Sequence, residues 1–138
     1  ASYTVCKKVA YGRIQSDDIF INDLKKFIKD AVFMAWVLLV VAGLFEVVWA
    51  YYMKVSEGFT KLTPSILTLI FMIASFTLLA YAMKTLPLGT AYTVWTGIGA
   101  MGAFLVGIFI LGEPASAMRM LAAVLIISGL ILMKLASS

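Results

Sequence analysis

Long runs without a charged residue constrain the fold of this chain more than any other feature. No charged residue occurs between Lys61 and Lys84, or from Thr85 to Gly112. About 20 apolar residues suffice to cross about 30 Å of hydrocarbon, where only helices and closed barrels satisfy the backbone. The sequence therefore predicts an all-α membrane protein with four transmembrane helices, at about residues 34–53, 62–83, 87–110 and 115–135.

The composition excludes most soluble functions. Of the 138 residues, 63% are hydrophobic and 13% are charged, whereas a soluble domain has about 25% charged residues. With no histidine and one cysteine, Cys6, the chain is expected to hold no metal, no cofactor and no catalytic residue. The net charge of +4 lies beside the spans, which favours contact with the lipid bilayer over nucleic acid.

Residues 1–33 differ from the rest, since they hold six of the eleven basic and four of the seven acidic residues. Apolar residues recur there at three- and four-residue spacing, with lysines on the other side. The apolar positions are Ile21, Leu24, Phe27, Ile28 and Ala31. This pattern predicts an N-terminal extension with an amphipathic helix over about 17–32 that lies on the membrane surface.

Glu46 is the one charged residue within the first apolar span, 34–53. An ionised carboxylate at the bilayer centre costs about 2.5–3.5 kcal/mol even on lenient insertion scales, and such residues are usually functional. Glu57 and Glu113 fall in loops, where solvated carboxylates are expected. Glu46 is therefore the candidate for binding a proton or a cation, and a merely structural carboxylate is the alternative.

The residues around Glu46 form a chemically sensible site for a small organic cation. Gly43 and Trp49 share its helical face and would leave room and bring an aromatic wall. Three further candidates come from the second and third spans: Ser75, Tyr92 and Trp95. The carboxylate supplies charge, the rings supply cation–π attraction and the hydroxyls orient both. The alternative for the aromatic residues is an interfacial belt.

Small residues mark two other regions. Gly97, Gly99 and Gly102 in the third span indicate either a hinge or close helix packing. In the last span, small residues at near-helical spacing predict a dimer interface, with packing inside one chain as the alternative. They are Ala122, Ala123, Ser128 and Gly129.

From Met34 onward the chain resembles the small multidrug resistance transporters, and in particular their guanidinium-exporter branch. The resemblance rests on four motifs and covers essentially all of residues 34–138. The motifs are GLFEVVWA (43–50), PSILTLIFMIASF (64–76), KTLPLGTAYTVWTGIGAMG (84–102) and SGLILMK (128–134). Trp49 and the KTLPLGTAY segment favour the guanidinium branch over the quaternary-ammonium branch.

The resemblance implies an antiparallel, dual-topology homodimer in the inner membrane that exchanges guanidinium for protons. Glu46 of each chain would bind either protons or the cation, and the dimer would alternate between inward- and outward-facing forms. Trp49, Ser75, Tyr92 and Trp95 would line the site and hydrogen-bond the carboxylates. Two alternatives stay open: a broad exporter of quaternary-ammonium or hydrophobic cations, and a non-transporting membrane scaffold.

Residues 1–33 have no counterpart in that resemblance, and their charge conflicts with dual topology. Without them, basic residues flanking the spans are nearly balanced, with two on the N-terminal side and three on the other; with them, the balance is eight to three. Under the positive-inside rule this bias favours a cytoplasmic N-terminus. Three explanations are open: an added segment, a segment folded back so that it does not steer insertion, or pairing with an oppositely oriented partner chain.

Overall fold

The computed structural model describes residues 2–137, and these form four α-helices and no strand. The helices are α1 (Ser2–Val55), α2 (Leu62–Ala82), α3 (Leu88–Phe109) and α4 (Ala117–Ala136). Each is long and apolar enough to cross a membrane. With 21, 22 and 20 residues, α2 to α4 are about 30–33 Å long, which matches a hydrocarbon core of about 30 Å. The chain is therefore a multi-pass membrane protein, as the sequence predicted.

The chain divides into two compact units, Ala1–Phe33 and Met34–Ser138. The helix predicted over 17–32 is not a separate element, because α1 begins at Ser2 and continues without a break to Val55. No proline precedes Pro64 and Gly12 is the sole glycine before Gly43, so the sequence contains no strong helix breaker there. Residues 2–30 are exposed, and their location on a membrane surface stays a prediction.

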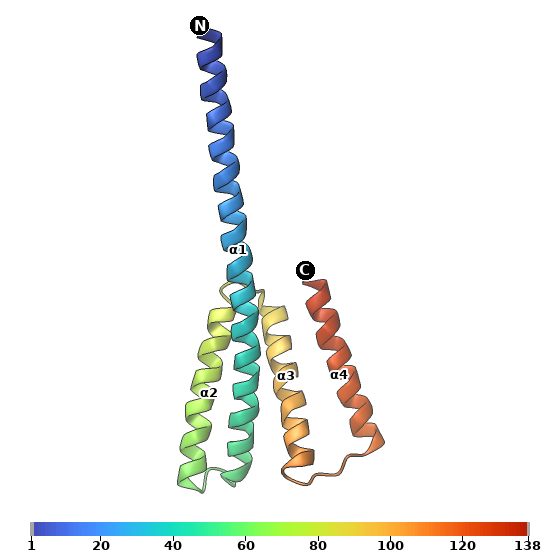
Figure 1. The fold of residues 1–138 in the computed structure, drawn as a ribbon. Helices are drawn as coiled ribbons and strands as arrows, with labels where there is room; N and C mark the ends of the chain where they lie inside the picture. Colours follow the sequence, from blue (N-terminus) through green and yellow to red (C-terminus); the bar gives the residue numbers. More distant parts are fainter. Residues whose placement is uncertain (1, 138) are drawn as a thin grey trace. The chain divides into compact units, whose positions relative to one another are not determined.

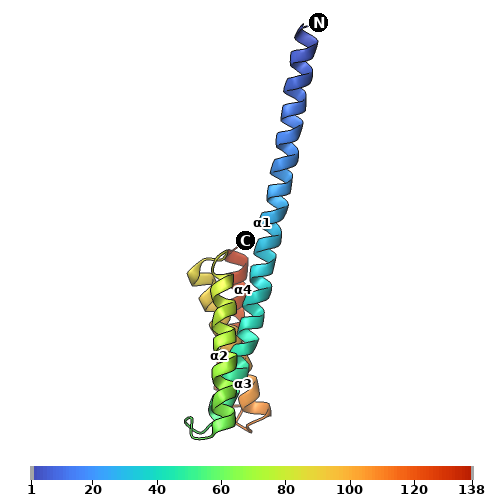
Figure 2. The same cartoon turned by 90° about the vertical axis from the view of Figure 1, so that its left-hand side faces the viewer.

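Within Met34–Ser138 the helices form an antiparallel bundle. The α1–α2 and α3–α4 connections lie at one end, and the α2–α3 connection and the end of α4 lie at the other (Figure 1). The side view has the same two ends (Figure 2). Helix α3 contacts both α2 and α4. The bounds of α2 to α4 differ from the predicted spans by at most two residues at either end.

Prolines and a serine cap explain where these helices begin. Pro87 is the extended N-cap of α3, and Pro64 lies in the first turn of α2, where a missing N–H costs little. The first turn of α4 is capped by Ser116, whose hydroxyl accepts a hydrogen bond from the Arg119 N–H at 3.3 Å.

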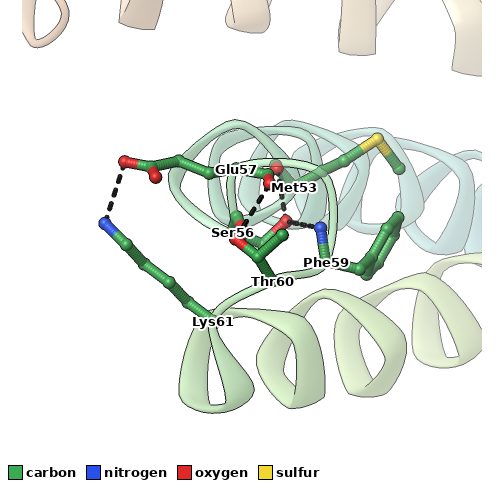
Figure 3. Close-up of polar contacts among 6 residues, drawn as sticks. All are labelled: Met53, Ser56, Glu57, Phe59, Thr60 and Lys61. Atoms are coloured by element: carbon green, nitrogen blue, oxygen red, sulfur yellow. Dashed lines mark hydrogen bonds and ion pairs between the residues drawn. The ribbon is translucent and has the colours of Figure 1, made fainter.

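Ser56 organises the turn between α1 and α2 (Figure 3). Its buried hydroxyl donates to the Met53 carbonyl at 2.7 Å and accepts from the Phe59 N–H at 3.1 Å. Glu57, Gly58 and Phe59 follow with φ values of 49°, 73° and 65°. Three consecutive left-handed residues are costly for side chains other than glycine, so the Ser56 hydrogen bonds offset backbone strain.

Both loop carboxylates are paired rather than simply solvated. Glu57 binds Lys61 at 2.9 Å, and Glu113 binds Arg119 at 2.8 Å. All four side chains are at least 37% exposed, so each pair contributes about 0–1 kcal/mol.

The buried core lies toward the end of the bundle that holds the α2–α3 connection, and it is rich in alanine. It consists of Ala35, Leu39, Ala42, Leu79, Ala82, Leu86, Ala91, Val94 and Trp95. Small side chains let helix backbones approach closely, which is how membrane helices pack in a lipid solvent. In α4, by contrast, Ala123 is the one residue that the structure gives as buried.

Candidate membrane-embedded binding site

Glu46 lies near the middle of the bilayer if Trp36 marks its edge. The Lys134 ammonium lies 3.4 Å from the centroid of the Trp36 ring, and such cation–aromatic pairs are typical of the membrane interface. Ten residues of helix separate Trp36 from Glu46, which is about 15 Å and about half the hydrocarbon thickness.

The Glu46 carboxyl group occupies space that Gly99 of α3 leaves open. A Cβ atom at Gly99 would overlap the carboxyl carbon and Oε2 of Glu46. Oε2 is buried and has no hydrogen-bond partner among the described residues. The closest approach of α3 to this carboxylate therefore depends on a glycine.

Trp49 carries the second unpaired polar atom of the site. Its indole Nε1 is buried without an acceptor in the described part of the chain, as Glu46 Oε2 is without a donor. These two atoms lie on side chains three residues apart on one face of α1. Leaving a buried polar group unpaired costs about 1–3 kcal/mol, so two neighbouring cases indicate a site that another group completes.

Ser75 and Trp95 are joined to each other and to the backbone of α1. The Trp95 indole donates to the Ser75 hydroxyl at 3.0 Å, and that hydroxyl donates to the Ala42 carbonyl at 2.7 Å. In an α-helix the carbonyl of residue 42 also accepts the N–H of residue 46. Ser75 is therefore bonded to the helical turn that carries Glu46, while its hydroxyl makes no hydrogen bond to the carboxylate.

Aromatic rings connect α1, α2 and α3, beginning at Trp49 on the helical face that carries Glu46. Phe76 lies edge-on to Trp49, with ring centroids 6.4 Å apart, and to Trp95 at 5.6 Å. Tyr92 lies 5.5 Å from Trp95. Phe76 and Tyr92 are 47% and 52% exposed in the single chain. Sequence reasoning missed Phe76 although it directly follows Ser75, because a lone phenylalanine in an apolar span carries no distinct signal.

The other glycines of the prediction lie at close helix contacts. A Cβ at Gly43 would lie 2.6 Å from the Ile98 side chain, so Gly43 makes room for α3 and Gly99 makes room for the carboxylate. Gly97 faces Leu130, and Gly102 faces Val47 in the same way. Helix α3 is continuous from Leu88 to Phe109. Close packing thus accounts for these glycines in this conformation, and their use as a hinge stays a prediction.

The small residues of α4 separate into two groups. Ala123 is buried within the chain, at 7% exposure. Ala122, Ser128 and Gly129 are exposed, and a Cβ at Gly129 would contact nothing within 4 Å. Those three residues therefore remain available for a second chain, whereas Ala123 packs internally.

Comparison with known proteins identifies the family of this chain. The family model described as Small Multidrug Resistance protein matches residues 34–126. A protein named Guanidinium exporter from Yersinia pseudotuberculosis serotype I (strain IP32953) is 62% identical over 104 residues, which are 75% of this chain and 100% of that protein. One of the same name from Escherichia coli (strain K12) is 56% identical over 104 residues, which are 75% of this chain and 99% of that protein. The chain belongs to the small multidrug resistance family.

Proposed function

We propose that this chain is a secondary transporter, not an enzyme, that exports guanidinium or small guanidinyl cations in exchange for protons. The names of its relatives support the substrate class. The observation that carries the proposal is Oε2 of Glu46, a buried carboxylate oxygen that has no partner among the described residues and lies against Gly99.

A guanidinium ion fits a carboxylate in an aromatic surrounding. The ion is planar and donates two parallel N–H···O bonds to one carboxylate. The rings of Trp49, Phe76, Trp95 and Tyr92 form a connected series from α1 to α3. Their faces supply cation–π attraction that rises when the cation is desolvated. A carboxylate beside the start of such a ring series therefore favours a flat organic cation over a hydrated metal ion.

Competition at Glu46 supplies the coupling. A carboxylate that has bound a proton loses its charge and with it most of its attraction for the cation. Protons entering from one side would then release guanidinium, and guanidinium entering from the other would release protons. Alternating access would require α3 to move against α1, with Gly97, Gly99 and Gly102 as the proposed hinge.

An antiparallel homodimer is the assembly that we propose for this site. Tyr92 and Phe76 leave about half of their surface uncovered in the single chain, and α4 exposes nearly its whole length. The exposed Ala122, Ser128 and Gly129 permit close helix contact. The six basic residues before Met34 bias insertion toward one orientation, so the alternative assembly pairs this chain with an oppositely oriented partner chain.

The test is guanidinium uptake into proteoliposomes under an imposed pH gradient. Wild-type protein should accumulate guanidinium, and Glu46→Gln should abolish uptake because the replacement can neither bind protons nor pair with the cation. Glu57→Gln is the matched control: it removes an exposed carboxylate paired with Lys61 and should leave uptake unchanged.

Uptake by Glu46→Gln at the wild-type rate would refute the proposal. Uptake of tetraalkylammonium ions in preference to guanidinium would replace it with a quaternary-ammonium exporter. Both variants must elute from gel filtration with the same oligomeric size as the wild type, so that loss of transport is not loss of folding.

A further inference from the structure

An apolar groove runs between α1 and α4 over α3, apart from the Glu46 site. It has a volume of about 570 Å³. Its walls and floor include Val37, Val41, Val94, Ile98, Leu130 and Ile131. All of these side chains are hydrocarbon, so the groove itself offers a cation no counter-charge.

One charged residue, Lys134, stands among the groove-lining residues, beside Trp36. The lysine ammonium lies 3.4 Å from the centroid of the indole ring. No carboxylate in the described residues pairs with Lys134. Contact with an aromatic face leaves the N–H donors of the ammonium able to bind an anion. Because Trp36 marks the membrane edge, the Lys134 ammonium beside it lies at that edge too.

We propose that this groove binds an anionic phospholipid, with its phosphate on Lys134 and one acyl chain along the apolar walls. The Lys134 ammonium, at the level of the lipid headgroups, attracts an anionic phosphate, and the hydrocarbon lining of the groove suits an acyl chain. A guanidinium ion would meet Lys134 as a like charge and would find no acceptor in the lining.

A second copy of the chain is a poorer occupant. Covering Lys134 with protein would desolvate its charge unless a carboxylate came with it. Within residues 34–137, Glu57 and Glu113 already pair with Lys61 and Arg119, and Glu46 lies in the middle of its span, so a second copy could neutralise Lys134 only with an aspartate from its residues 1–33. A lipid phosphate brings its own negative charge and disturbs none of these pairs.

Native mass spectrometry with phosphatidylglycerol and phosphatidylcholine of identical acyl chains tests this proposal. Wild-type protein should retain phosphatidylglycerol preferentially, and Lys134→Gln should reduce that preference about fivefold. Lys84→Gln is the matched control, since Lys84 is also a lysine over an aromatic ring, Tyr81 at 4.6 Å, but lies outside this groove. It should keep the wild-type preference.

A second variant tests the tail. Val37→Phe adds a ring to a half-exposed wall position and should lower retention of both lipids, whereas Leu44→Phe, exposed on the same helix outside the groove, should not. Equal preference in wild type and Lys134→Gln would overturn the proposal, as would equal loss in Lys84→Gln. A shift of Lys134→Gln from dimer to monomer without altered lipid preference would assign the groove to a protein interface instead.

Discussion

Removing the Ser75 hydroxyl should destabilise the bundle and disturb the binding site together. Ser75 is fully buried, and Trp95 is 6% exposed. In Ser75→Ala, the Trp95 indole loses the acceptor that it has at 3.0 Å, and the Ala42 carbonyl loses a donor at 2.7 Å.

The two losses differ in cost. The Ala42 carbonyl keeps its helical hydrogen bond from the N–H of residue 46, so it contributes little to the loss of stability. The Trp95 N–H remains buried without any acceptor, which costs about 1–3 kcal/mol. We therefore expect Ser75→Ala to lower the free energy of unfolding by about 1–3 kcal/mol.

Unfolding in mixed micelles, followed by circular dichroism as the denaturing detergent is raised, measures this difference. Thr77→Val is the control, since the Thr77 hydroxyl is exposed and bonds its own helix at the Ile73 carbonyl; its change should stay within about 0.5 kcal/mol. In a Trp95→Phe background the Ser75→Ala effect should largely vanish, because the indole donor is already gone. Equal effects of Ser75→Ala and Thr77→Val, or an undiminished effect beside Trp95→Phe, would refute this account.

Two further substitutions test other contacts. Gly99→Ala places a Cβ where the Glu46 carboxyl group lies, so guanidinium exchange in proteoliposomes should fall at least about tenfold, a cost of about 1.4 kcal/mol or more. The control is Gly89→Ala in the same helix, whose Cβ meets nothing within 4 Å and which should retain exchange. Equal exchange rates in the two variants would contradict the packing role of Gly99. Ser56→Ala removes the two hydrogen bonds that the Ser56 hydroxyl makes in the α1–α2 turn, and it should lower the free energy of unfolding by about 1–2 kcal/mol in the same detergent titration. An unchanged unfolding midpoint would mean that the turn does not depend on that hydroxyl.

Much of the fold could be predicted from the sequence because a bilayer leaves the chain few choices. Charge-free runs of about 20 residues must be helical in hydrocarbon, and Pro64 and Pro87 mark where two of the helices begin. The first helix was harder, since an amphipathic pattern predicts a helix but contains no signal for whether it stops before the span. Without a proline or a glycine cluster near Met34, α1 continues through that position.

The residue types of the candidate site could be read from the sequence, whereas their contacts could not. A lone carboxylate in an apolar span drew attention to Glu46, and helical spacing placed Trp49 on the same face. Spacing within one helix cannot tell which glycine of another helix will face a side chain. Gly43 was therefore expected beside the carboxylate, whereas Gly99 of α3 lies there and Gly43 faces Ile98.

The two unpaired atoms of the site differ in what can satisfy them, and this difference bears on assembly. Glu46 Oε2 needs a donor, which a proton or a guanidinium ion supplies. Trp49 Nε1 is a donor and needs an acceptor, which neither of those ions can offer. A carboxylate is the acceptor that the proposed site contains: its two oxygens have about four lone-pair sites, of which a guanidinium ion bound through two parallel bonds takes two. In the proposed homodimer, a second Glu46 would accept from the indole while the first holds the cation.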